Sequence, residues 1–519
     1  MVLAAGFVAA VYLLKPRLHQ AIKQRAEAYL QTQFGSSIQF SEFHMALFPR
    51  IRMTVQGVVM RHHGRTDIPP LIEVRTITVD ANPAAFWGPQ HEISRVRLDG
   101  LQIHTPPALP DGAGAPLIHG THTDLARKYP FVIDETDADN ALIVLLRKPG
   151  DSDRPPNEFE IHQLVLHGFG FDRAAAFHAV LTNPRPKGEI VCDGKFGPWN
   201  ADVPSQTPVS GNYNFRNTDL ATFQGLKGIL SSVGSFSGLL DYLTVTGVTD
   251  TPDFALRTSD HPMALHTDFS AIVDGTNGNT ILNNVTAAFR HTVLQVHGSV
   301  VDKYPQVKGR TIVLDATSLR ARVEDLLALT VNSDRPVMTG AAQLKTRILI
   351  PEGTGDLVDR LHLDGQFALT DARFTSSTAQ QKVDTLSRKG QGKPNDIDIT
   401  DAASDFQGRF ALSQAEVSFS NLEFKVQGAS VSLRGVYDLD NGQLDFRGQL
   451  HMDAKLSQTM TGWKSALLKP FDHFFHGQDG GSRIPIKITG SRQNPTFATD
   501  FRDKNNPKST PGGNSPSRD

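Results

Sequence analysis

Over most of this chain, apolar residues occupy every second position, which is the pattern of a β-strand with one buried and one solvated face. The segment 431–452 shows this most clearly, because two alternating runs flank Asp440-Asn441-Gly442, a sequence typical of a hairpin turn. The apolar positions of the segment are Val431, Leu433, Gly435, Tyr437, Leu439, Leu444, Phe446, Gly448, Leu450 and Met452. We therefore predict an antiparallel hairpin with one apolar and one polar face.

The same alternation recurs from the first hundred residues to the end of the chain, so the pattern predicts a mostly β protein built largely from hairpins. The runs that carry it are Ile51, Met53, Val55; Ile77, Val79; Val96, Leu98; Leu294, Val296, Gly298, Val300; Leu361, Leu363, Gly365, Phe367, Leu369; and Leu422, Phe424, Val426, Gly428. Glycines recur on the apolar side of these runs. They indicate either sharp twist beside a narrow channel or plain bulges.

Three segments depart from the alternation. Residues 222–243 are rich in Gly and Ser and carry apolar residues at helical spacing, and residues 457–475 place aromatic residues on one helical stripe that Pro470 interrupts. Residues 379–404 are polar, which predicts a loop. We expect a few short helices in an otherwise β chain.

The N-terminus holds an unbroken apolar run, Val2–Leu14. As a helix it would cover about 20 Å, short of the roughly 30 Å hydrocarbon core of a membrane. A cleaved signal peptide, a buried soluble helix and an uncleaved anchor that starts upstream of Met1 are the three interpretations. The anchor is favoured because Lys15-Pro16-Arg17, not a small-residue cleavage site, follows the run. Taken alone, the basic residues after the run would place the chain in the cytoplasm.

Residues 17–34 form an amphipathic helical pattern that ends at Gly35. The last residues, 503–519, have the polar, Pro- and Gly-rich composition of a disordered tail.

The composition fits a large β protein and excludes some partners. The 519 residues include 43 Gly and 31 Pro, and charged residues make up 20%, which suits many short strands joined by turns. The formal net charge is −2, so the chain has no basic excess for a nucleic-acid backbone. Cys192 is the single cysteine, which excludes an intrachain disulfide and a cysteine-based zinc site.

The sequence contains none of the common catalytic and metal-binding motifs that we compared with it. The histidines lack the His-Glu-x-x-His spacing, and the acidic segment 134–140 lacks the glycine and closing glutamate of a calcium loop. The segment 234–238 resembles a nucleophile elbow, but Phe236 stands where the serine would be. Gly168-Phe169-Gly170 lacks the third glycine of a dinucleotide loop. We therefore expect no enzyme activity, no cofactor and no metal.

Both ends of the chain resemble the AsmA-like family of bacterial envelope proteins. At the N-terminal end, the order is an apolar anchor, a helix that closes on Gly35, the strand 37–40, then 47–55 and 95–103. At the C-terminal end, the matching segments are 435–439, the hairpin that follows it, 484–490 and 494–497. Each motif is short, so the resemblance lies in their order.

This resemblance implies an elongated, incompletely closed antiparallel sheet, a groove or taco-like shape, behind an N-terminal transmembrane helix. It implies a single-pass protein of the inner (plasma) membrane whose bulk lies in the periplasm. We divide the chain into an anchor (1–16), an AsmA-like N-terminal region (17–150), a central β region (151–350), an AsmA-like C-terminal region (351–502) and the tail (503–519). No catalytic residues follow from the resemblance.

Two functions remain open. The first is binding or conducting membrane lipids by their acyl chains along a hydrophobic groove, in support of outer-membrane assembly and envelope lipid homeostasis. The second is a non-conducting scaffold or regulator of outer-membrane protein assembly with a filled β core, whose partners would be envelope assembly proteins. Candidate groove-lining residues are Val431, Leu433, Tyr437, Leu439, Leu444, Phe446 and Leu450. Candidate membrane-interface residues are Trp463, Phe471, Phe474 and Phe475, which could equally pack against the sheet.

Overall fold

The fold is taken from a computed structural model. It describes residues 37–46, 51–61, 66, 69–82, 91–105, 131–145, 157–200, 204–259, 261–303, 307, 309–331, 333, 335–357, 359–459, 481–491 and 495–499. The predicted anchor, the amphipathic helix 17–34, the tail 503–519 and most of the aromatic stripe 457–475 lie outside these residues.

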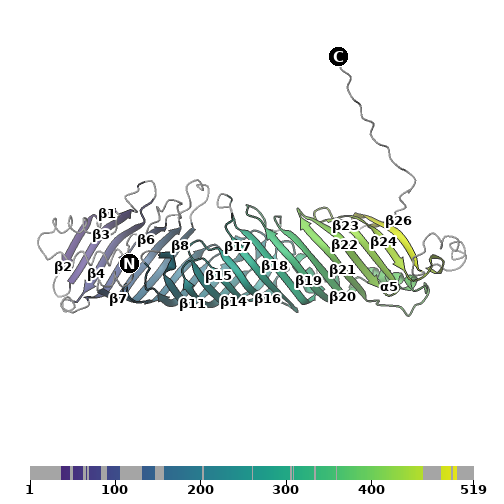
Figure 1. Cartoon of the computed structure of the whole chain (residues 1–519), viewed down its shortest axis with the longest axis horizontal. Coiled ribbons are helices and arrows are strands. Elements are labelled where there is room, and N and C mark those ends of the chain that lie inside the picture. Colours follow the sequence, from purple (N-terminus) through teal and green to yellow (C-terminus); the bar gives the residue numbers. More distant parts are fainter. Residues whose placement is uncertain are drawn as a thin grey trace, which may run out of the picture. The chain divides into compact units, whose positions relative to one another are not determined.

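The described strands belong to one 26-stranded, largely antiparallel sheet that is not closed into a barrel (Figure 1). The strands are β1 (Ser37–Gln39), β2 (Glu42–Ala46), β3 (Ile51–Arg61), β4 (Ile72–Ala81), β5 (His91–Asp99), β6 (Gln102–Thr105), β7 (Phe131–Leu145), β8 (Asn157–Phe169), β9 (Ala175–Pro184), β10 (Lys187–Phe196), β11 (Pro208–Asp219), β12 (Leu226–Lys227), β13 (Ile229–Leu239), β14 (Tyr242–Leu256), β15 (Met263–Val273), β16 (Thr280–Phe289), β17 (Thr292–Val301), β18 (Thr311–Arg322), β19 (Met338–Ile350), β20 (His362–Phe374), β21 (Ser404–Ser413), β22 (Glu416–Val426), β23 (Ala429–Asp438), β24 (Gln443–Met452), β25 (Ser482–Ser491) and β26 (Pro495–Thr499). This confirms the predicted mostly β, antiparallel fold.

The described helices are few and short. Two are α-helices, α4 (Val323–Thr330) and α5 (Ser377–Gly390), and three are 3-10 turns, η3 (Pro204–Gln206), η4 (Leu220–Thr222) and η5 (Leu456–Thr459). No helix within the described ranges is both long and apolar enough to cross a membrane.

Most pairings in the sheet join consecutive strands as antiparallel hairpins, because short turns leave neighbours in the chain as neighbours in space. The parallel pairings lie near the N-terminus, where β7 pairs with both β5 and β6. Antiparallel pairs of non-consecutive strands are β1–β3, β4–β6, β11–β13 and β12–β14. The chain divides into two compact units: unit 1 comprises 1–318, 328–333 and 347–361, and unit 2 comprises 319–327, 334–346 and 362–519.

Unit 1 contains a fully buried core near its N-terminal strands. The alternating residues of β3, β4 and β5 point into it, and Val55, Ile77 and Val96 are each 0% exposed. Ile133 of β7 and Phe169 of β8 extend the same core. The alternation predicted for these strands is confirmed, and its apolar side is buried there as an ordinary protein interior.

The helical interpretation of residues 222–243 is wrong. This segment contains β12 and β13, and β13 pairs along its length with β11 and β14. Gly and Ser are poor helix formers, so cross-strand pairing decides the conformation here. The ring of Tyr213 occupies the space above Gly234: a Cβ on that glycine would lie 2.8 Å from the tyrosine hydroxyl oxygen.

The prediction of a loop over 379–404 is wrong for its first half, which is α5. Ser376 caps this helix, because its hydroxyl accepts a hydrogen bond from the Ala379 N–H. Val383 packs with Val426, Ala429 and Met452 in a buried cluster. The helix is therefore stabilised by a few apolar side chains that pack against the sheet, and its mostly polar composition gave no sign of it in the sequence.

Candidate functional site

The apolar side of unit 2 forms four rows that run across neighbouring strands. We call this set the C-terminal apolar face. The strand registers place its members side by side in rows: Phe406, Phe424, Val431, Leu450, Ile484; Gly408, Leu422, Leu433, Gly448, Ile486; Phe410, Phe419, Gly435, Phe446, Ile488; and Leu412, Val417, Tyr437, Leu444, Gly490. Five strands thus present one uninterrupted apolar surface, and the intervening side chains point to the other side of the sheet.

Six of the seven candidate lining residues belong to this face: Val431, Leu433, Tyr437, Leu444, Phe446 and Leu450. The seventh, Leu439, follows the last residue of β23 and lies in the turn, where it is 47% exposed. The hairpin predicted over 431–452 is confirmed, with Tyr437 opposite Leu444 and Asp438 accepting hydrogen bonds within the turn.

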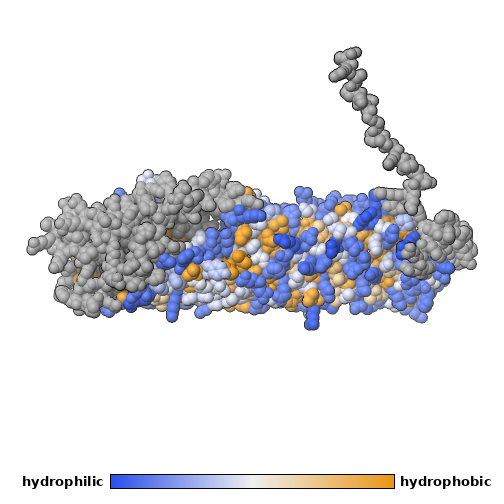
Figure 2. Space-filling view, viewed as in Figure 1, coloured by the Kyte–Doolittle hydropathy of each residue, from blue (hydrophilic) through white to orange (hydrophobic). Residues whose placement is uncertain are grey.

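The C-terminal apolar face is covered less completely than the N-terminal core. Phe446, at 7% exposed, is the one fully buried large side chain of the four rows, and the other large apolar side chains there are half-buried. A protein interior of this size would hold several side chains near zero exposure, as the N-terminal core does. In Figure 2, hydrophobic residues lie among hydrophilic ones at the surface of the described strands.

Aromatic rings and glycines both contribute to the rows. Phe367 of β20 lies 6.1 Å from Phe410 and 6.5 Å from Phe419 between ring centroids, and Phe419 lies 5.8 Å from Phe446. Gly435 and Gly448 allow the strands to approach closely, since a Cβ there would lie 2.1 Å and 1.8 Å from backbone oxygens of the neighbouring strand. Bulky residues at these positions would push the strands apart, so the glycines fix the shape of the face.

Helix α5 covers one end of the C-terminal apolar face. Its Val383 and Leu386 belong to a cluster with Phe424, Leu450 and Ile484, which are the row next to the strand ends. Hydrogen bonds hold the helix in this position: the Ser387 hydroxyl donates one of 2.9 Å to the carbonyl of Gln427. The Asp384 carboxylate accepts one of 2.9 Å from the N–H of Ala402. The remaining rows have no such cluster with α5.

Unit 1 carries a second half-buried surface, which we call the central apolar face. Its members on β11 and β13–β18 are Tyr213, Phe236, Leu243, Val245, Leu265, Phe269, Leu282, Val285, Leu294, Val296 and Leu314. Tyr213 lies across Gly234 and Gly247 and shares a hydrogen bond of 3.1 Å with Ser232, and burial raises the pKa of its hydroxyl. The tyrosine hydroxyl thus occupies the space that the missing side chains of the two glycines leave free.

A short segment joins opposite ends of these strands. We call residues 351–357, which follow β19, the strap. Near its start, the Glu352 carboxylate accepts a hydrogen bond of 2.9 Å from the N–H of Lys303, just after the end of β17. At its end, the Leu357 N–H donates a hydrogen bond of 3.0 Å to the carbonyl of Gln224, and Asp356 pairs with Arg257. Gln224 precedes β12 and Arg257 follows β14.

The strap shows that the sheet of unit 1 is curled. The strand register places the end of β17 and the start of β14 at the same edge of the sheet. The register pairs Leu243 with Val273, Val273 with Thr280 and Thr280 with Val300. From Leu243 to Leu256 the strand runs about 43 Å, whereas the chain from Glu352 to Leu357 can span at most about 18 Å. A flat sheet could not satisfy both contacts, so the strands bend until their two ends approach. Bulges in the β14–β15, β15–β16 and β16–β17 pairs favour such bending.

The central apolar face lies on the inside of this curl. Leu243 and Val245 are half-buried, whereas Thr244 and Thr246, on the other side of the same strand, are exposed. A curl in the opposite direction would enclose the threonines instead. The strap therefore crosses the open side of the central apolar face.

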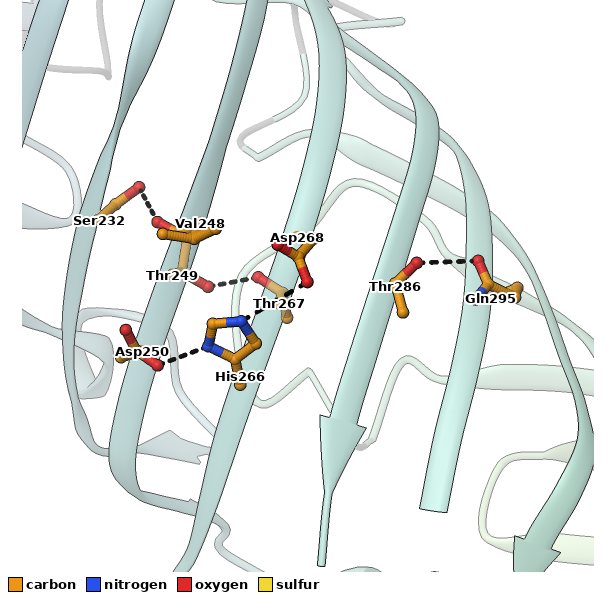
Figure 3. Close-up of polar contacts among 9 residues, drawn as sticks. All are labelled: Ser232, Val248, Thr249, Asp250, His266, Thr267, Asp268, Thr286 and Gln295. Carbon is orange, nitrogen blue, oxygen red and sulfur yellow. Dashed lines mark hydrogen bonds and ion pairs between the residues drawn. The ribbon is translucent and has the colours of Figure 1, made fainter. Parts of the chain in front are cut away.

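The outer side of the same strands is polar. It carries a shallow depression of about 720 Å³ whose lining includes the side chains of Asn212, Ser235, Thr246, Ser270 and Asn284. Figure 3 shows His266 between two carboxylates, with Nδ1 2.6 Å from Asp250 and Nε2 3.5 Å from Asp268. The hydrogen bond with Asp250 raises the pKa of His266. The two imidazole nitrogens face different carboxylates, so these groups do not converge on one ion.

The residues that the sequence motifs singled out occupy ordinary structural positions where the structure describes them. No group of three His, Cys, Asp or Glu side chains within the described ranges could hold a metal ion. The nucleophile-elbow-like segment lies inside β13, and Cys192 is buried, which raises the pKa of its thiol to about 11. Asp274 closes its own loop by accepting hydrogen bonds from Thr276 and Asn277.

No family model, curated protein or solved structure matches this chain. The candidate membrane-interface residues Trp463, Phe471, Phe474 and Phe475 lie outside the described residues. Sequence reasoning missed the strap and the tyrosine above two glycines. Both depend on contacts between distant segments, and the only local signal was Gly353 and Gly355 beside the strap's acidic residues.

Proposed function

We propose that the apolar faces bind the acyl chains of membrane lipids and conduct lipids along the sheet. The observation that carries the proposal is incomplete burial: large apolar side chains form continuous rows yet remain half-buried. Soluble proteins rarely leave contiguous apolar surface of this kind without a ligand or partner. The protein would bind lipid without altering it, and we propose neither a catalytic residue nor a cofactor.

The dimensions of the C-terminal apolar face support an acyl chain as the occupant. From β21 to β25 the rows cross four strand spacings, or about 19 Å, which exceeds the roughly 15 Å depth of one leaflet of a hydrocarbon core. Each buried methylene contributes about 0.8 kcal/mol, so ten methylenes along one row would gain about 8 kcal/mol before the cost of ordering the lipid. The polar opposite side would keep the loaded sheet in water.

The motifs that resemble the AsmA-like family support a location for this activity. In that setting residues 1–16 would anchor the chain in the inner membrane, and the sheet in the periplasm would contribute to outer-membrane assembly and envelope lipid homeostasis. Residues Trp463, Phe471, Phe474 and Phe475 would then be available to meet a membrane interface.

Rebinding of lipid to the delipidated protein tests the proposal. We expect the purified protein to carry phospholipid in native mass spectrometry and, after delipidation, to take up phosphatidylethanolamine or a fluorescent fatty acid to saturation. A clean lipid-free mass together with no uptake would contradict lipid binding and favour the scaffold function. Heat-unfolded protein is the control for non-specific adsorption.

A further inference from the structure

The strap closes part of the central apolar face, and its own chemistry suits a hinged element. Gly353 and Gly355 have φ angles of +152° and +106°, a region that side-chain-bearing residues rarely adopt. The contacts described at its tip are polar: the Asp356–Arg257 ion pair and the Leu357–Gln224 hydrogen bond. The Arg257 side chain is 60% exposed and the Asp356 side chain 10% exposed, so water reaches the guanidinium directly and the carboxylate mainly when the tip moves away.

The base of the strap is held separately from its tip. The Glu352 carboxylate accepts a hydrogen bond from the N–H of Lys303, beside the end of β17. The Arg360 guanidinium donates a hydrogen bond to the carbonyl of Pro351. Gly309 and Gly353 also approach closely, because a Cβ on Gly309 would lie 3.1 Å from the Gly353 nitrogen. The tip can therefore leave Gln224 and Arg257 while the base remains attached to the strand ends near β17.

We propose that the strap is a gate: its tip must leave Gln224 and Arg257 before an acyl chain can pass sideways onto or off the central apolar face. The proposal rests on the proposed lipid function and concerns the rate of exchange at that same face. A closed strap encloses the face on the side where the strand ends approach one another. The gate thus controls how fast lipid is exchanged and leaves the apolar contacts themselves unchanged.

A reversible cross-link between the tip and the opposite strand ends tests the gate. Gln224→Cys and Leu357→Cys would be combined in a Cys192→Ala background, since a backbone hydrogen bond of 3.0 Å brings these residues within disulfide range. The measurement is stopped-flow uptake of a fluorescent fatty acid from phosphatidylethanolamine vesicles. We expect oxidation to slow uptake onto the central apolar face at least tenfold and reduction to restore it.

The matched control is a second disulfide that does not involve the strap. Ser235 and Thr246 are cross-strand partners on the polar side, with their hydroxyl oxygens 3.2 Å apart, so Ser235→Cys with Thr246→Cys cross-links β13 to β14 alone. Oxidation of this pair should leave uptake unchanged. Equal rates for the oxidised and reduced strap variant, with the probe still bound at equilibrium, would overturn the gate and leave lipid binding intact. No binding of the probe by the wild-type protein would overturn both.

Removing the ion pair between Asp356 and Arg257 gives a second measurement that needs no cross-link. Arg257→Gln removes the ion pair with Asp356 from an exposed side chain, and we expect uptake to become several times faster at unchanged equilibrium binding. Arg373→Gln removes an arginine of similar exposure from its ion pair with Asp401 in unit 2 and should not change the rate. An unchanged rate for Arg257→Gln in a folded protein would also overturn the gate.

Discussion

Replacing Leu433 with lysine is expected to abolish most acyl-chain binding at the C-terminal apolar face while the protein stays folded. Leu433 lies in the middle of the C-terminal apolar face, between Leu422 and Gly448 on the neighbouring strands. It is half-buried, so a lysine can extend its ammonium group to water and remain compatible with the sheet. A bound acyl chain would lose contact there with about three methylenes, about 2.4 kcal/mol, which is a roughly fiftyfold weaker affinity.

The measurement is equilibrium binding of a fluorescent fatty acid, with circular dichroism and thermal unfolding recorded on the same samples. Ser432→Lys is the matched control, because Ser432 is the preceding residue of β23 and its side chain is exposed on the polar side. We expect the control to bind like the wild type. Equal affinity of the Leu433 and Ser432 variants would show that acyl chains do not lie on this face.

The same substitution in the N-terminal core should have the opposite outcome. Val55 is 0% exposed and packs within the cluster of β3, β4 and β5, so Val55→Lys would bury an unpaired charge. Such a charge costs several kcal/mol in a packed interior, and we expect more than about 3 kcal/mol of destabilisation. The N-terminal strands should then unfold or become sensitive to protease.

Hydrogen exchange over β3, β4 and β5 measures this effect directly, because loss of the core exposes their backbone N–H groups. Gln56→Lys is the control, since Gln56 is the next residue of β3 and is exposed on the other side. Unchanged protection in Val55→Lys would mean that the N-terminal rows are as open as the C-terminal ones. The pair Val55 and Leu433 therefore separates a filled core from an open face within one chain.

Local patterns in the sequence predict the strands well. The hairpin of β23 and β24 follows from alternation and from Asp440-Asn441-Gly442, and both signals act within about twenty residues. Alternation also places Val55 and Leu433 on the apolar side of their strands. It does not show that one is enclosed and the other half-buried, because exposure depends on what packs over the sheet.

The features that sequence reasoning missed depend on distant contacts or on weak local signals. Residues 222–243 match a helical spacing, yet they pair with β11 and β14. Helix α5 has low mean hydropathy and is stabilised by Val426 and Met452 from other strands. The strap is defined by the hydrogen bond between Leu357 and Gln224, and no local sequence pattern indicates this long-range contact.

Site-specific photocrosslinking tests most directly whether acyl chains lie on the apolar face. A benzophenone amino acid would replace Leu433 or, in a second variant, Ser432, and cells or lipid-loaded protein would be irradiated. We predict phospholipid adducts by mass spectrometry at Leu433 and none at Ser432. Adducts only to another protein at Leu433, or equal lipid labelling at the two positions, would contradict lipid binding by the apolar face.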